Sequence, residues 1–206
     1  MFWFGCNNAA KEIVKEEAIF SRERAVNLGI LPYLGSKFVV LSAICVVQVL
    51  MLMLVIYGVF EACHPLLGLQ SPPAVYRLDY VSQFGVLLLL AVTGVAAGLL
   101  LSACVATPDR ANTLLPYLVI PQIILGGGLV TVGHGVLRIL AYVLSPVYWG
   151  YRAVHRGATD VLPPDFPFHQ NYDDRVWISC VVLAGIAAVL LAATAWFLQQ
   201  KDHGRE

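Results

Sequence analysis

The chain has 206 residues, of which 59% are hydrophobic and only 13% are charged. Soluble domains average about 25% charged residues, so this composition excludes an ordinary soluble globular domain. Acidic and basic side chains balance to a net charge of zero, so nucleic acid is not expected as a partner. The five cysteines are scattered without a CxxC pair, and neither a disulfide framework nor a zinc site is predicted.

The first predicted element is an amphipathic helix over residues 7–28. Asn7 or Asn8 is expected to cap its start, because an Asn side chain accepts hydrogen bonds from the free N–H groups of a first turn. Gly29 and Pro32 end it. Helices that lie on lipid are usually rich in Lys and Arg. Acids and bases are nearly balanced here, which favours a protein partner over an interfacial helix on headgroups.

Four stretches that follow contain no Asp, Glu, Lys or Arg. A helix rises about 1.5 Å per residue, so ~20 residues cross the ~30 Å hydrocarbon layer, and each stretch is long enough. The fold class predicted is therefore an all-α membrane protein with about four transmembrane helices. The predicted spans are residues 38–60, 82–106, 112–132 and 176–198.

Small residues and glycine breaks mark two of these stretches. In the second span, Gly94 and Gly98 are spaced to let two helix backbones approach closely, which predicts helix packing. In the third, the run Gly126, Gly127 and Gly128 predicts a break, which membrane depth tolerates only where the backbone is buried in protein or faces water.

Residues 133–175 are expected to form an external loop with a re-entrant or interfacial helical segment. The apolar run Val136–Leu144, followed by Ser145 and Pro146, is too short to cross a bilayer. The aromatic residues Tyr148, Trp149 and Tyr151, which suit the headgroup level, are expected to close the segment. Pro146 and the three glycines are the predicted break residues of this region.

The distribution of Lys and Arg predicts an orientation, with both chain termini in the cytoplasm of a multi-pass plasma or inner-membrane protein. About eight cations lie on the side assigned to the cytoplasm and five on the other. The first set is Lys11, Lys15, Arg22, Arg24, Lys37, Arg110, Lys201 and Arg205; the second is Arg77, Arg138, Arg152, Arg156 and Arg175.

No catalytic, cofactor-binding or metal site is predicted. The sequence contains no GxxxxGK[ST], HExxH or GxSxG motif. Asp173 and Asp174 fit a solvated loop end better than a cation site. Proton- or ion-driven transporters need titrating or coordinating groups at membrane depth, and the spans offer only Gln and hydroxyl side chains. Energy for any transport would therefore enter from outside the spans, with the amphipathic helix as the port.

The run Glu12–Leu28, with Tyr33 and Ser36-Lys37 at the start of a span, resembles the first cytoplasmic loop of ABC-2-type permeases. It is most similar to the white-type (G subfamily) half-transporters and their bacterial relatives, some of which carry FHA domains. Gly126–Leu129 and Ser145–Tyr151 fit the same family. The resemblance implies that the first segment is a coupling helix that docks on an ATPase domain.

The resemblance also implies the partners. These are an ABC ATPase domain that holds the ATP, a second permease unit and membrane lipid. The expected ATPase contacts are Glu12, Lys15, Glu16, Arg22, Glu23 and Arg24. Family permeases have six spans, so the chain is expected to be the C-terminal part of one, either a fragment or a truncated product. The function expected is the permease portion of an ATP-driven exporter, without enzyme activity of its own. The alternative is a non-transporting membrane scaffold or assembly subunit.

Overall fold

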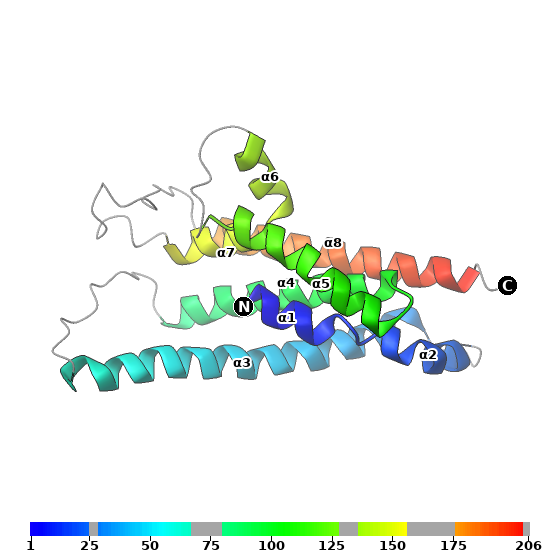
Figure 1. Ribbon diagram of the computed structural model, residues 1–206, viewed down its shortest axis with the longest axis horizontal. Coiled ribbons are helices and arrows are strands. Elements are labelled where there is room, and N and C mark those ends of the chain that lie inside the picture. The colour runs from blue at the N-terminus through cyan, green and yellow to red at the C-terminus, as the bar shows by residue number, and fades with distance from the viewer. Residues whose placement is uncertain (25–28, 67–79, 128–135, 156–175, 204–206) are drawn as a thin grey trace. The chain divides into compact units, whose positions relative to one another are not determined.

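A computed structural model describes residues 1–24, 29–66, 80–127, 136–155 and 176–203 (Figure 1). These residues form helices and short connections, with no strand among them. The elements are α1 (Phe2–Ala9), the 3-10 turn η1 (Val14–Glu16), α2 (Glu17–Arg24), α3 (Ile30–Leu66), α4 (Tyr80–Cys104), α5 (Pro108–Leu125), α6 (Val136–Leu144), α7 (Pro146–His155) and α8 (Val176–His203).

The chain divides into two compact units. Unit 1 comprises Met1–Cys45, Ala91–Pro121 and Ala184–Glu206, and unit 2 comprises Val46–Leu90 and Gln122–Leu183. Unit 1 therefore holds α1, η1 and α2, the first part of α3, the second parts of α4 and α8, and α5 up to Pro121. Unit 2 holds the remaining parts of these helices together with α6 and α7.

Three helices in the described part of the chain are long and apolar enough to cross a membrane. They are Ile30–Val59 of α3, Tyr80–Cys104 of α4 and Val176–Lys201 of α8. The prediction of an all-α membrane protein is confirmed. The span predicted at 112–132 is not among the three, because α5 starts with the polar turn Pro108–Asn112 and residues 128–132 lie outside the described residues.

In unit 1, α1 packs against α4 with almost no side chain between the two backbones. A Cβ built at Gly94 would lie 2.2 Å from the carbonyl oxygen of Phe2, and one at Gly98 would lie 2.5 Å from that of Cys6. On the facing helix, a Cβ at Gly5 would lie 1.9 Å from the carbonyl oxygen of Ala91. Glycine on both helices is thus what allows this contact. Cys6 and Ala9 are fully buried in it.

The single helix predicted over residues 7–28 is divided, and this part of the prediction was wrong. Asn7 and Asn8 lie inside α1, whose N-cap is Met1, and do not start a helix. The chain turns after Ala9 and resumes through η1 into α2; residues 25–28 lie outside the described residues. Ala10, Ile13 and Val14 are buried at this turn, so anchoring these apolar side chains takes precedence over a continuous helix.

The turn between α4 and α5 is shorter than the sequence indicated. The predicted spans left residues 107–111 between them, but α4 ends at Cys104 and Pro108 is already the first residue of α5. Proline suits that position because the first helical N–H has no acceptor in any case. The Thr107 hydroxyl accepts a hydrogen bond from the Arg110 N–H (3.4 Å) at this start.

The glycines predicted to break the third span follow directly after α5. The helix ends at Leu125, and Gly127 has a φ of 80°, a left-handed conformation typical of the residue after a helix. Gly128 lies outside the described residues. Pro116 and Pro121 are accommodated within α5.

In unit 2, the helix expected at Val136–Leu144 is present as α6, but a second helix, α7, follows it directly. The Ser145 hydroxyl accepts a hydrogen bond from the Tyr148 N–H (3.2 Å) and caps α7. Pro146, predicted as a break residue, is the first residue of α7. Ser followed by Pro is a helix-start pattern, because Pro suits the first helical position.

Candidate functional site: the N-terminal segment and its anchors

The N-terminal segment, residues 10–24, is fixed to α4 by a buried serine. The Ser102 hydroxyl accepts hydrogen bonds from the N–H groups of both Ile13 and Val14, each at 3.0 Å. The first N–H groups of a new helix lack intrahelical acceptors, and here a residue of another helix supplies one. Ser102 is fully buried, and Val14 packs beside it against Val105 and Ala111. The start of the segment is therefore tied to α4 in a dry environment.

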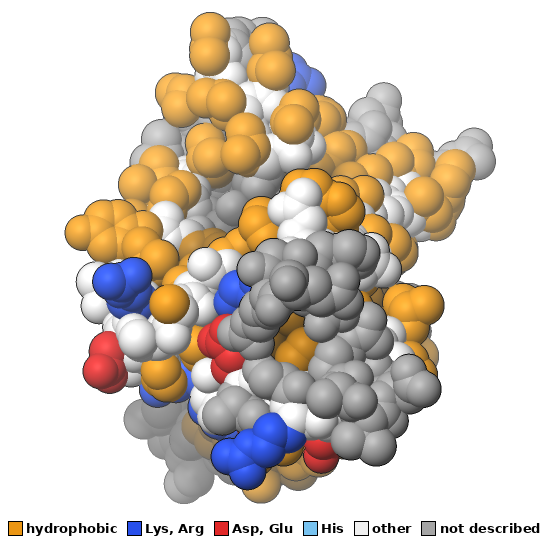
Figure 2. All heavy atoms as spheres, turned by 90° about the vertical axis from the view of Figure 1, so that its right-hand side faces the viewer, with side chains coloured by type: hydrophobic (Ala, Val, Ile, Leu, Met, Phe, Trp, Pro, Cys, Tyr) orange, Lys and Arg blue, Asp and Glu red, His pale blue; other side chains and the backbone are white. Residues whose placement is uncertain are grey.

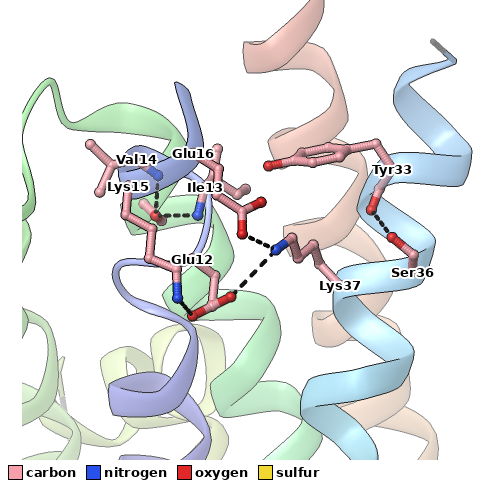
Figure 3. Close-up of polar contacts among 9 residues, drawn as sticks. Glu12, Ile13, Val14, Lys15, Glu16, Tyr33, Ser36 and Lys37 are labelled. Atoms are coloured by element: carbon pink, nitrogen blue, oxygen red, sulfur yellow. Dashed lines mark hydrogen bonds and ion pairs between the residues drawn. The ribbon is translucent and has the colours of Figure 1, made fainter. Parts of the chain in front are cut away.

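A second anchor joins the same segment to the start of α3 (Figure 3). The Lys37 Nζ lies 2.6 Å from Glu16 Oε1 and 3.5 Å from Glu12 Oε2. Glu12 also pairs with Lys15. The side chains of Lys37, Glu12 and Glu16 are between 21% and 28% exposed, so these charges are partly withdrawn from solvent. Lys37 thus links two carboxylates of the segment to the first span.

Two further contacts hold α2. The Phe20 ring packs on Tyr33 of α3, with ring centroids 4.6 Å apart, and Phe20 is buried. Glu17 pairs with Lys201 at the end of α8, at 3.8 Å. The N-terminal segment therefore makes polar contacts with the beginning of α3, the end of α4 and the end of α8, all within unit 1.

The six residues predicted at an ATPase contact fall into two groups. Glu12, Lys15 and Glu16 take part in the ion pairs around Lys37. Arg22 and Glu23 are exposed on α2, and the side chain of Arg24 lies outside the described residues. Figure 2 faces the right-hand side of Figure 1 and shows Lys, Arg, Asp and Glu side chains on this face. The exposed charges of α2 are thus available to a partner, whereas the two glutamates already have an internal one.

The short helices of unit 2 are joined by an aromatic cluster around a buried arginine. The guanidinium of Arg152 lies 5.0 to 5.5 Å from the ring centroids of Tyr142, Tyr148 and Trp149. It donates a hydrogen bond to the Tyr142 hydroxyl, and Trp149 Nε1 donates to the Tyr142 carbonyl oxygen at 2.9 Å. Arg152 is only 6% exposed. Cation–π contacts of this kind are strongest when desolvated, so the cluster holds α6 and α7 together.

The cluster also changes the pKa of the Tyr142 hydroxyl. Burial alone raises its pKa, but hydrogen bonds from Arg138 and Arg152, with the charges of both arginines, lower the pKa overall. The Arg138 guanidinium lies 5.7 Å from the Tyr142 ring centroid. Gln122 of α5 adds a third link, because its Nε2 donates to the carbonyl oxygen of Leu144 at 3.0 Å.

Sequence reasoning missed the roles of three residues of these anchors: Ser102, Lys201 and Arg152. Ser102 continues the four-residue spacing of Gly94 and Gly98 on one helix face, but that spacing indicates helix packing and not a hydrogen-bond acceptor. Lys201 and Arg152 were used only as cations that set the orientation. The partner of Lys201, Glu17, is distant in sequence, and no local pattern indicates it. Arg152 follows Trp149 and Tyr148 by three and four residues, a helical spacing that could have indicated their contact.

The long apolar helices define an integral membrane protein. The charged N-terminal segment is joined to these helices by ion pairs and hydrogen bonds. The sequence comparison identifies the kind of membrane protein. Residues 1–157 match the profile of the ABC-2 type transporter family, and the chain belongs to that family. The membrane domain of this family is the permease part of the transporter and not the ATPase.

A relative supports the assignment over nearly the whole chain. The chain is 26% identical, over 204 residues, to the ABC transporter ATP-binding/permease protein Rv1747 of Mycobacterium tuberculosis. The alignment covers 93% of this chain but only 22% of that protein, so the chain spans about a fifth of the length of the relative it matches.

Proposed function

We propose that the chain is the permease portion of an ATP-driven exporter of the white type, similar to its FHA-linked bacterial relatives. A partner ATPase domain would hold the ATP and act on the N-terminal segment from the cytoplasm, where both termini would lie. Two permease units would pair side by side within the membrane. The relative's printed name joins an ATP-binding part to a permease part, which supports this arrangement.

The observation that carries the proposal is the attachment of the N-terminal segment to the spans. A movement of α2 has to be transmitted to the membrane helices, and a segment with few contacts to them would move without displacing them. Here Ser102 and Lys37 fix residues 12–16 to α4 and α3 through contacts of 2.6 to 3.0 Å. The exposed Arg22 and Glu23 on α2 lie outside these anchors. The segment therefore has one part for a partner and another for transmission.

This division refines the list of contact residues. Arg22, Glu23 and Arg24 are the proposed ATPase contacts, and Glu12 and Glu16 act on the permease side through Lys37. Opposite charges across an interface mainly set specificity and association rate. Reversing the charges on α2 is therefore expected to weaken partner binding, while reversing those at Lys37 is expected to leave the partner bound but uncoupled.

The test uses the chain together with its ATPase in membrane vesicles. The variant Arg22→Glu/Glu23→Lys is expected to lose co-purifying ATPase, and Lys37→Glu is expected to retain it while the ATPase no longer responds to the permease. Asp109→Lys/Arg110→Glu, which exchanges two exposed charges on the first turn of α5 without changing the net charge, is the control for the double variant. Unaltered co-purification and unaltered ATPase activity in both variants would contradict the proposal.

A further inference from the structure

Unit 2 contains an apolar groove that the transport proposal does not use. It has a volume of about 820 Å³ and lies between α3 and the start of α4. Its lining is Val47, Leu50, Met51, Met53, Leu54, Tyr57, Tyr80, Val81 and Phe84. The volume is within the ~300–1,000 Å³ typical of small-molecule sites, and no charged side chain lines it.

The two ends of the groove differ. At one end Tyr57 and Tyr80 meet edge to face, with ring centroids 4.8 Å apart, and the Tyr57 hydroxyl donates a hydrogen bond to Gln83. Tyr57 lies just before the end of the apolar part of α3, and Tyr80 is the first residue of α4. Tyrosines at span ends favour the membrane–water interface. This end of the groove is therefore placed at headgroup level.

From there the groove descends into the hydrocarbon layer. Tyr57 and Val47 are ten residues apart on one helix, which corresponds to about 15 Å, half of the ~30 Å hydrocarbon thickness. That depth is one leaflet. Two of the three methionines of the chain, Met51 and Met53, lie in the wall, and methionine adapts its shape to irregular apolar ligands.

The groove is continuous with a membrane-facing surface. Little of the apolar part of α3 is buried within the chain, whereas more than half of that of α4 is. Leu50, Met51 and Leu54 are each more than half exposed. An apolar surface of this kind on a membrane span is covered by lipid, and the groove is the place where that surface is hollowed.

We propose that this groove holds one acyl chain of a phospholipid from the leaflet on the Tyr57–Tyr80 side. The headgroup lies beside the two tyrosines, and the chain runs along Leu54, Leu50 and Val47. The site is independent of ATP and of the partner ATPase. A lipid held here stays bound when detergent replaces the other lipid around α3, and this distinguishes it from the surrounding bilayer lipid.

The test uses the full chain reconstituted in liposomes with a phosphatidylcholine whose acyl chain carries a photoreactive diazirine. Leu50→Trp fills the groove, and Val55→Trp is the matched control, because both residues are 53% exposed on α3 and Val55 does not line the groove. Mass spectrometry locates the labelled residues after irradiation and detergent extraction.

The expected label concentrates on groove residues of both helices, including Val81 and Phe84. It should fall about tenfold in Leu50→Trp, because an indole in the groove excludes the chain, and remain unchanged in Val55→Trp. If labelling falls equally in the two variants, or falls in neither, the label reports ordinary bilayer contact and the proposal is overturned. Cross-linking of two copies of the chain through the groove in place of lipid labelling would overturn it as well.

Discussion

The Nζ of Lys37, near the start of α3, lies 2.6 Å from Oε1 of Glu16 in the N-terminal segment. The two residues are 21 positions apart and belong to different helical elements. Glu12 approaches the same amine at 3.5 Å, so one cation serves two carboxylates. This ion pair and the hydrogen bonds to Ser102 hold the charged N-terminal segment against α3 and α4.

Charge reversal at Lys37 tests the link. Lys37→Glu places three carboxylates together and should loosen residues 12–24, whereas Lys37→Glu/Glu16→Lys restores an opposite pair. A partly exposed ion pair is worth about 1 kcal/mol, which corresponds to roughly fivefold faster amide hydrogen exchange in the segment. Lys11→Glu, at an exposed position, is the control. The link is refuted if exchange in residues 12–24 is the same in Lys37→Glu and in the wild type.

Removing the Ser102 hydroxyl should be more costly. Ser102→Ala leaves the buried N–H groups of Ile13 and Val14 without their acceptor, which costs about 1–3 kcal/mol for an unsatisfied buried donor. The measurement is thermal unfolding in detergent. Ser42→Ala is the matched control, because the buried Ser42 hydroxyl has no hydrogen-bond partner among the described residues, and its removal should be neutral. Equal stability losses in the two variants would argue against a capping role for Ser102.

The glycine contact between α1 and α4 predicts a selective effect of added methyl groups. In Gly98→Ala the new Cβ meets the Cys6 carbonyl oxygen and the Ala9 Cβ at 2.5 and 2.8 Å, and α1 has to move away. We expect a loss of about 1–3 kcal/mol of stability and alkylation of the normally buried Cys6, read out by mass spectrometry.

The control for this contact lies on the same helix. Gly85 faces open space, so Gly85→Ala should keep Cys6 protected and slightly favour the helix. If Cys6 remained protected in Gly98→Ala too, the close approach of α1 and α4 would be wrong.

The aromatic cluster of α6 and α7 predicts a pH signature. The pKa of Tyr142 is lowered in the folded chain, because Arg138 and Arg152 outweigh the effect of burial. A lowered folded-state pKa stabilises the fold above that pKa, and this stabilisation is lost as the pH falls through it.

An ultraviolet titration of tyrosinate measures this pKa. The chain has nine tyrosines, so the informative quantity is the difference between wild type and Tyr142→Phe. Tyr142→Phe should remove absorbance that develops below the range of ordinary tyrosines, near pH 10. If the difference appears only at or above pH 10, the two arginines do not act on Tyr142 as the structure indicates.

Local patterns were sufficient for much of this fold. Charge-free stretches located α3, α4 and α8, because lipid requires long apolar helices and excludes charge. The end of α5 before the glycine run and the nine-residue helix α6 also follow local signals, because backbone and length constraints act locally.

The errors lie where a distant residue decides the local structure. The helix predicted from Asn7 is interrupted because Ser102, 88 residues away from Val14, supplies the acceptors at the turn. One difference is local: Pro146, predicted as a break residue, begins α7, and the Ser145 hydroxyl caps that helix by accepting a hydrogen bond from the Tyr148 N–H. The internal use of Glu12 and Glu16 was also not foreseeable, since helical spacing shows only that they are polar, not which cation they meet.

The most direct test of the account is a photo-cross-link from α2 to the ATPase. A photoreactive benzoylphenylalanine replaces the exposed Glu23, and a second variant carries it in place of Val189, which is 69% exposed on α8. After irradiation of intact membranes, adducts are identified by mass spectrometry and by labelling with an azido-ATP analogue. The account predicts an ATP-binding adduct from position 23 and none from position 189. If position 23 yields no ATP-binding adduct, or position 189 yields the same one, the N-terminal segment is not where the ATPase acts.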